Sequence, residues 1–263
     1  MSTLAMSPQQ KAWVDRISVG LFVAVWILAA TRFAPSFAMV FFGKAEGLRA
    51  GFEAGSQSGS VFEAHQRLGV GLAMLLGGVT GYLLADLIAG MVHWIADRFF
   101  DPETPLLGPM LIAPFREHHV DALGITRHDF FEVSGNNALI TIPLVGLIFL
   151  LPEPTTFAMF FGVAHLFSLS VALVATNQFH RWAHSPSPPP IARRLHAWGL
   201  ILTPRGHAKH HRRGHDRAYC VTSGWLNPLL DRVQIFTRIE QLLGSDSTHP
   251  SAHTPGAESA KYR

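Results

Sequence analysis

The segment RGHAKHHRRGHD, residues 205–216, places four histidines within twelve positions. Such a stretch suits a basic tract that binds phosphate, a low-complexity tail that collects metal, or one part of a built metal site. A helix over residues 204–216 would place its histidines on one face and its basic residues on the opposite face. The histidines are His207, His210, His211 and His215, and the basic residues are Arg205, Lys209, Arg212 and Arg213. This separation favours a metal-binding face and leaves the basic face to hold a phosphate or dock an acidic protein.

Local signals mark where this helix would begin. Thr203 suits the N-cap and Pro204 the first helical position, where the N–H that proline lacks would have no partner. Gly206 and Gly214 weaken the same helix, because glycine loses more backbone freedom on folding than other residues do. We therefore expect a helix from Pro204 that contains two weak points.

Two further segments carry imidazoles at helical spacing. In NQFHRWAH, His180 and His184 are four residues apart and therefore share one helix face. In ADLIAGMVHWIAD, His93 and Asp97 have the same spacing at the end of an apolar run. Other polar residues on these two faces, expected to orient the imidazoles, are Asn177 and Asp86.

A fourth segment, FREHHVDALGITRHDF, contains two adjacent histidines. On a helix, His118 and His119 would point about 100° apart. Adjacent histidines can therefore serve two different metal ions. His128 is expected to return to the same site from the loop that follows.

The composition indicates a membrane protein, because 48% of the 263 residues are hydrophobic and 15% are charged. A membrane-spanning helix needs roughly 20 apolar residues. Four apolar stretches are candidates, the first of them extended to either side: Ile17–Ala30, Leu68–Trp94, Asn137–Leu151 and Thr156–Phe179. The third is short, so we expect it either to be tilted or to begin near Phe130. Pro152 and Pro154 would form a tight connection to the fourth.

Four spans place both termini on one side of the membrane. Ten of the 21 Lys and Arg residues fall within 181–238, where the acids are Asp216 and Asp231. An excess of positive charge favours the cytosolic side of a membrane. Both termini are therefore predicted in the cytosol, and the bacterial inner membrane is favoured over the endoplasmic reticulum.

The predicted fold is all-α, an integral membrane four-helix bundle with a cytosolic histidine-rich helical cap. A cytosolic N-terminal segment covers 1–16, the membrane domain with its cap covers 17–244, and a disordered tail covers 245–263. Residues 34–66 are expected to form an outer loop with a short interfacial piece at Phe37–Phe42.

This topology gathers histidines on one face of the membrane, because the loop at 95–135 and the segment at 180–244 lie on the same side. Eleven histidines are then expected there: His93, His118, His119, His128, His180, His184, His196, His207, His210, His211 and His215. Nitrogen ligation without cysteine suits zinc, copper or iron, and one zinc ion needs three or four ligands. So many imidazoles indicate two metal ions. A membrane two-iron site with few carboxylates would use dioxygen to remove hydrogen from an unreactive C–H bond of a lipid chain.

Some of the remaining residues are interpreted as structural. The histidines in this class are His65, His165, His196, His249 and His253. His165 lies in mid-span and is expected to bond a neighbouring helix or Ser168. Cys220 is the one cysteine of the chain, which excludes an internal disulfide, and it is expected to be buried filler. The clustering of the basic residues argues against a nucleic-acid partner, and no hydrolase or phosphate-loop motif is present.

Several of these motifs resemble the lipid desaturase family that contains plasmanylethanolamine desaturase (the Kua proteins) and the plant plastid palmitate desaturase. The motifs are GYLLADLIAGMVHWIAD, FREHHVDALGITRHDF, NQFHRWAH and YCVTSGWLNPLLD. The resemblance extends from about Gly81 to Glu240. It implies a multi-pass membrane enzyme with two iron ions, dioxygen as co-substrate, a phospholipid substrate, and a cytochrome b5-like or ferredoxin-like electron donor.

The resemblance also implies roles for individual residues. The metal ligands would be His93, Asp97, His118, His119, His128, His180, His184, His207, His210, His211 and His215. The acids and amide that orient the imidazoles would be Asp86, Glu117, Asp121, Asp129 and Asn177.

The branch of the family decides the expected substrate. The REHH and ITRHDF motifs are similar to the plasmanyl branch, which forms the vinyl ether double bond of plasmalogens, whereas HAKHH is similar to the plant acyl branch. The chain departs from the plasmanyl pattern at Asp121-Ala122 and at Ser134–Asn137. We expect a desaturase of 1-O-alkyl phospholipids. The alternatives are an acyl-phospholipid desaturase or hydroxylase, a membrane zinc hydrolase, and a metal-binding scaffold without catalysis.

Overall fold

The computed structural model describes residues 6–42, 59–212 and 214–244, and every regular element within these ranges is helical. The predicted all-α fold is therefore confirmed. Arg213, the tail at 245–263 and its two histidines, His249 and His253, lie outside the described residues.

Four helices are long and apolar enough to cross a membrane. They are α1 (Pro8–Phe42), α2 (Gly59–Arg98), α4 (Phe130–Ile148) and α5 (Phe157–His184). The four predicted spans are therefore confirmed, and the third begins at Phe130 as expected. Each helix is longer than the apolar stretch predicted for it.

Both ends of the predicted outer loop at 34–66 are helical, and residues 43–58 lie outside the described residues. α1 continues to Phe42, so Phe37–Phe42 is the last part of this helix and no separate interfacial piece. Arg32 has partners at the neighbouring helix end: its guanidinium donates to the carbonyls of Phe149 and Leu151. A satisfied charge does not have to leave the membrane, so the helix continues.

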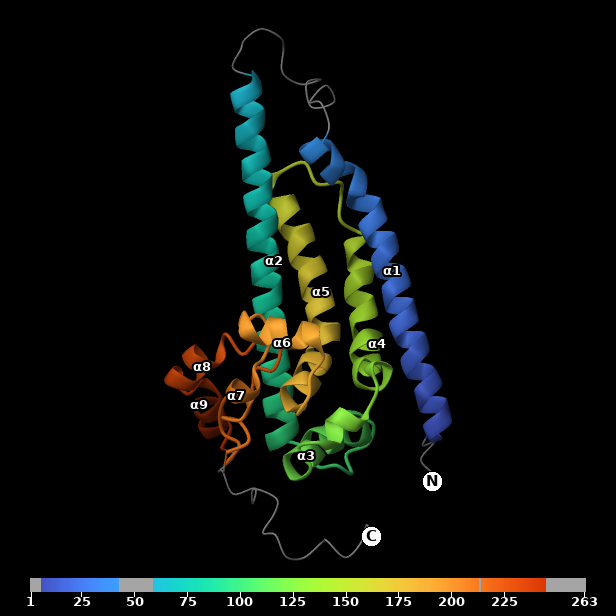
Figure 1. Ribbon diagram of the computed structural model, residues 1–263, viewed down its shortest axis with the longest axis vertical. Helices are drawn as coiled ribbons and strands as arrows, with labels where there is room; N and C mark the ends of the chain where they lie inside the picture. Colours follow the sequence, from blue (N-terminus) through green and yellow to red (C-terminus); the bar gives the residue numbers. More distant parts are fainter. Residues whose placement is uncertain (1–5, 43–58, 213, 245–263) are drawn as a thin grey trace, which may run out of the picture.

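The spans lie in the order α2, α5, α4, α1, each packed on the next (Figure 1). Glycines bring the first pair into close contact: a Cβ atom at Gly77 would lie 2.3 Å from the carbonyl oxygen of Phe161, and one at Gly81 2.2 Å from that of His165. Small residues four apart allow two membrane helices to approach in this way. His165 bonds the neighbouring helix as expected, since its Nδ1 lies 3.0 Å from the hydroxyl of Thr80.

Replacing Gly81 with alanine is expected to destabilise the protein, because the new methyl group meets backbone that cannot move without separating α2 from α5. Overpacking of this kind costs about 1–3 kcal/mol. Gly78→Ala is the matched control, since a Cβ there meets no atom within 4 Å. Thermal unfolding in detergent should show a lower Tm for Gly81→Ala and an unchanged or higher Tm for Gly78→Ala. Equal Tm values would contradict the packing argument.

The cap lies at one end of the bundle, where α2 and α5 end and α1 begins (Figure 1). It contains a π-helical turn η2 (Gly108–Ile112), α3 (Ala113–Val120), a 3₁₀ turn η3 (Gly124–Arg127), α6 (Pro190–Ala197), α7 (Pro204–His207), α8 (Asn227–Val233) and α9 (Ile235–Leu242). Glu240 of α9 accepts a 2.7 Å hydrogen bond from the indole of Trp94 and lies 3.2 Å from the guanidinium of Arg98. These contacts hold the cap against α2.

The predicted helix at 204–216 was wrong in its length. Thr203 caps α7 as expected and accepts a 3.0 Å hydrogen bond from the amide of Gly206, but the helix ends at His207. Turns follow, and the backbone reaches φ values of +103° at Gly214 and +43° at His215. Glycine adopts this region freely, so the second weak point of the predicted helix is where the chain reverses.

Candidate metal centre

The structure brings the histidines of four separate segments together at the junction of bundle and cap. Two groups of imidazoles have ligand nitrogens that all lie within 4.8 Å of one another. The first histidine group contains His118, His180, His184, His207 and His211. The second histidine group contains His93, His118, His119 and His210. His118 belongs to both, so the two groups are adjacent.

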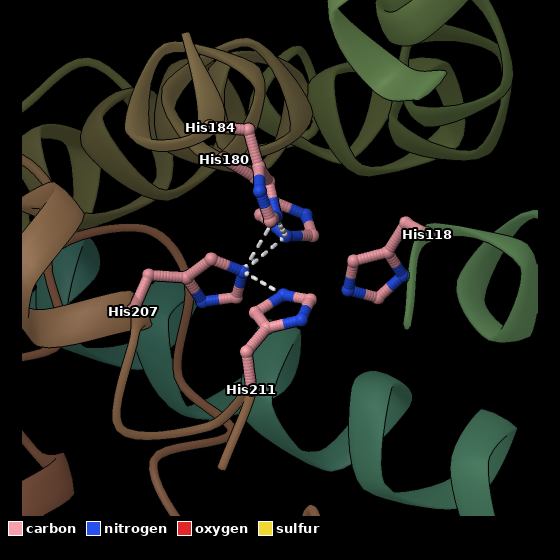
Figure 2. Close-up of side chains that lie close together, drawn as sticks. All are labelled: His118, His180, His184, His207 and His211. Carbon is pink, nitrogen blue, oxygen red and sulfur yellow. Dashed lines mark hydrogen bonds between the residues drawn. The ribbon is translucent and has the colours of Figure 1, made fainter. Parts of the chain in front are cut away.

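The first histidine group converges on His207 (Figure 2). The Nε2 atom of His207 lies 2.8 Å from that of His180, 2.8 Å from that of His184 and 2.9 Å from that of His211. One ring nitrogen of a neutral imidazole either donates or accepts, so it cannot satisfy three other ring nitrogens by hydrogen bonding. Nitrogens that bind one ion at about 2.1 Å would be separated by about 3.0 Å when they are at right angles. The observed spacing therefore suits a shared cation.

The second histidine group surrounds a buried carboxylate. An oxygen of Asp97 lies 3.5 Å from Nε2 of His93, 3.7 Å from that of His119 and 3.4 Å from that of His210. Within the described residues, neither oxygen of Asp97 has a hydrogen-bond partner, and the same is true of Nε2 of His93 and of His118. Buried polar atoms without partners are costly in a folded protein. A metal ion at this position would satisfy all of them.

Backbone carbonyls fix the orientation of two imidazoles in the second histidine group. Nδ1 of His93 lies 3.2 Å from the carbonyl oxygen of Tyr219, and Nδ1 of His210 lies 2.9 Å from that of Arg217. A carbonyl only accepts, so Nδ1–H donates in both cases and Nε2 keeps its lone pair for a metal. The carbonyls at 217 and 219 are a part of the site that the histidine pattern did not indicate.

Burial keeps the imidazoles of the cap neutral. Desolvation lowers the pKa of His118, His119 and His207, and neighbouring imidazoles lower each further. The same two causes, burial first, lower the pKa of His211 to about 3. Neutral imidazole is the form that binds metal, so the cap holds its ligands ready at neutral pH.

Acidification is expected to destabilise the metal-free protein. The pKa values of His207 and His211 lie below the value of about 6.5 for histidine in an unfolded chain, so below that pH the unfolded state binds more protons. The stability they contribute is present above pH 6.5 and is lost as pH falls toward their folded pKa values. Thermal unfolding of chelator-treated protein should show a Tm that decreases on acidification from pH 7 and decreases less in His211→Gln. A Tm that increases would contradict this.

Two histidines predicted as ligands lie outside both groups. The ring of His215 stacks on that of His119, with centroids 4.2 Å apart, and so borders the second histidine group. His128 is not brought to the cluster: its side chain is 60% exposed and its Nδ1 lies 3.3 Å from a carboxylate oxygen of Glu132. The loop after α3 passes through η3 and returns His128 to the start of α4, away from the other imidazoles.

The residues predicted to orient imidazoles have other contacts. Asp129 caps α4: its side chain accepts from the amide of Glu132, and its own amide donates to the Glu132 side chain. Asp121 pairs with Arg127, and Glu117 lines a cavity beside it. Asn177 donates a 3.0 Å hydrogen bond to the carbonyl of Val133 and so links α5 to α4.

Asp86 acts through the backbone of the cap. Its Oδ1 accepts hydrogen bonds from the amides of Thr222, Ser223 and Gly224 at 2.8–3.0 Å, and its side chain is fully buried. One turn further along α2, Gly90 leaves room for Cys220, whose Sγ would lie 2.6 Å from a Cβ at that position. Cys220 is fully buried, as expected. Along α2, Asp86 therefore contacts the backbone of the cap. His93 and Asp97, nearer the end of the same helix, lie at the second histidine group.

A cavity of about 820 Å³ opens beside the metal ligands. His118 and His180 form part of its wall, and apolar residues such as Leu173 and Ile140 line it further into the bundle. Its volume falls within the range of small-molecule sites, about 300–1,000 Å³. Arg205, Lys209 and Arg212 are exposed whereas His207 and His210 are buried, so histidines and basic residues are separated as predicted without a long helix.

The fold and the site define a membrane protein with a candidate two-metal centre that faces a cavity between its spans. A lipid desaturase domain matches residues 82–251, and the chain belongs to the lipid desaturase family. It is accordingly a desaturase, which is an oxidoreductase, and the hydrolase and scaffold alternatives are set aside.

Relatives from three kingdoms share much of this region. A plasmanylethanolamine desaturase of Myxococcus xanthus is 42% identical over 193 residues, which cover 73% of this chain and 68% of that protein. Plasmanylethanolamine desaturase 1 of Mus musculus is 38% identical over 65% of each chain. The chloroplastic fatty acid desaturase 4 of Arabidopsis thaliana is 34% identical over 64% of this chain and 50% of its own. No solved structure matches the chain.

Proposed function

We propose that the two histidine groups hold two iron ions and that the enzyme forms the vinyl ether double bond of 1-O-alkyl phospholipids. The proposed ligands are the eight histidines of the two groups together with Asp97, and His215 borders them. When bound, iron would supply the activation of dioxygen that removes two hydrogens from adjacent carbons. The overall reaction balances as one dioxygen, two electrons and two protons consumed, with two waters and one alkene formed.

The position of the imidazoles along the cavity carries this proposal. His180 lies seven residues after Leu173 on α5, so the apolar lining extends about 10 Å beyond the imidazole at the helical rise. The charged residues of the cavity, among them Glu117 and Asp121, lie at the end close to His118. A lipid with its head group at the charged end would place the first carbons of its chain beside His118 and His180. The double bond would therefore form next to the glycerol oxygen.

The chain's own residues would hold the substrate in this position. The apolar lining takes up the alkyl chain and excludes water from the reacting carbons, while the carbonyls at 217 and 219 keep two imidazoles in one tautomer. The relatives named for plasmanylethanolamine are more similar to this chain than the plant acyl desaturase is. An acyl chain beside the same imidazoles is the second candidate, because an ester differs from an ether by one carbonyl.

The exposed basic residues of the cap suit an electron donor. Arg205, Lys209 and Arg212 alternate in sequence with ligands of both histidine groups, so an acidic cytochrome b5-like or ferredoxin-like protein on this face would be close to both ions. The excess of positive charge near the cap supports a cytosolic position for this face. Reporter fusions at either end of the chain test the orientation.

Lipid mass spectrometry of cells that express the chain and are fed 1-O-alkylglycerol under air tests the substrate. New species two mass units lighter that mild acid destroys are vinyl ethers and support the proposal. Species two mass units lighter that survive acid would contradict the ether assignment and transfer the double bond to an acyl chain. An absence of oxygen-dependent change, with folded protein and a competent donor, would contradict both substrates.

A further inference from the structure

Three pairs of one acidic and one basic side chain line the charged end of the cavity, and each comes from a different element. On α1, Nζ of Lys11 lies 2.7 Å from a carboxylate oxygen of Asp15. The other two pairs are Asp121 with Arg127, around η3, and His128 with Glu132, at the start of α4. All six side chains belong to the cavity wall, and we call them the charged ring.

The charged ring has a consistent polarity. In each pair the basic side chain is more exposed than its acid: 46% against 2% for Lys11 and Asp15, and 63% against 44% for Arg127 and Asp121. The basic side chain is therefore the more accessible member of each pair. A ligand in the cavity would find both accessible basic groups and carboxylate acceptors on the same wall.

α1 is fitted closely to this position. Asp15 is buried, and a Cβ atom at Gly135 of α4 would lie 2.5 Å from its Oδ1. Glycine at 135 therefore lets α1 bring a charged pair to the cavity. α1 precedes the residues that match the family domain, which begin at 82. The wall of the cavity is therefore completed by α1, which lies outside the matched family domain.

We propose that the charged ring binds a zwitterionic phosphoethanolamine head group, an inference that rests on the proposed function of the cavity. Lys11 and Arg127 would hold the phosphate, and Glu132 would accept hydrogen bonds from the primary ammonium. A zwitterion adds no net charge to the cavity, and each of its two charges finds side chains of opposite sign on the wall. A head group held there would fix how far the alkyl chain of the lipid enters the cavity. It would thereby place the first carbons of that alkyl chain beside the imidazoles.

The test measures lipid retention and does not need turnover. The full chain and its variants are placed in nanodiscs that contain equal amounts of 1-O-alkyl phosphoethanolamine lipid, its phosphocholine analogue and alkylacylglycerol without a head group. Lipids that stay bound after transfer to detergent are counted by native mass spectrometry. The variants are Lys11→Gln, Glu132→Gln and, as a matched control, Arg16→Gln. Arg16 is on the same helix and pairs with Asp129, but it is not part of the cavity wall.

The wild type is expected to retain the phosphoethanolamine lipid preferentially. Loss of one charged hydrogen bond should lower lipid retention by about tenfold. Lys11→Gln should lower the retention of both phospholipids, and Glu132→Gln that of the phosphoethanolamine lipid alone. Glutamine at 132 can still complete the capping box of α4. Lys11→Arg should restore retention, which separates the loss of charge from misfolding.

Two results would overturn the head-group site: no preference in the wild type, or variants at 11 and 132 that retain lipid as Arg16→Gln does. A wild type that retains the phosphoethanolamine lipid but forms no alkene from it keeps the head-group site and overturns the catalytic proposal instead.

Discussion

Replacing His207 with alanine is expected to abolish desaturation and to empty the first histidine group. Its Nε2 is the atom on which His180, His184 and His211 converge, so its removal takes away the shared position of the group. The purified variant should lose about one of two bound metal ions, as a site with too few ligands does. Metal analysis and lipid mass spectrometry check the two effects separately. His118→Ala and His211→Ala should also abolish product without unfolding the spans.

The matched control for His207 is His196→Ala, since His196 is in the cap but in neither histidine group. It should keep both metal content and product. If His207→Ala retained full activity and unchanged metal, the two-metal assignment would be wrong. Loss of activity with both ions in place would instead limit His207 to a role in orienting substrate.

The sequence predicted well the features that depend on local periodicity. The apolar runs located the four spans, and the spacing of His180 and His184 placed both on one face at the end of α5. The stripe that includes His93 and Asp97 also follows from helix geometry alone. These residues are positioned by their own helix, so their neighbours in sequence are sufficient to place them.

Residues in loops were harder to place, because contacts distant in sequence decide their conformation. His215 has a positive φ and a ring stacked on His119, and helical periodicity cannot indicate either feature. Asp129 is different, because a local signal existed: the spacing of Asp129 and Glu132 is that of a capping box. The family resemblance suggested that Asp129 orients an imidazole. The capping-box spacing would instead have predicted its observed role as the N-cap of α4.

Pairs that join the cap to the bundle cannot be read from one sequence at all. Asp86 and the amides it binds are more than 130 residues apart, and nothing in the pattern around either indicates the other. The cavity depends on such pairs as well, because its wall combines α1, α2, α4 and α5 with the segment around α3. The histidines that come together in the two groups could be predicted from the sequence, whereas the shape of the cavity could not.

The second large effect is expected from Asp86→Ala, which should release the cap from α2. The substitution leaves the amides of Thr222, Ser223 and Gly224 without their acceptor in a buried position. Each unpaired buried amide costs about 1–3 kcal/mol, so the junction should open well before the spans unfold. The carbonyl of Tyr219 would then leave His93, and metal affinity should decrease by about 10–100-fold, as for other losses of a ligand's supporting partner.

Hydrogen exchange over residues 219–226, measured with the metal content of the same sample, checks this prediction. Asp86→Asn keeps an oxygen that can accept at the Oδ1 position, so it should exchange more slowly than the alanine variant. Asp101→Ala, at a side chain that is 72% exposed, should exchange like the wild type. Wild-type protection in Asp86→Ala would mean that α9 and its contacts to Trp94 hold the cap without help. Faster exchange with unchanged metal would show that the imidazoles of the second histidine group keep their orientation without the carbonyl at 219.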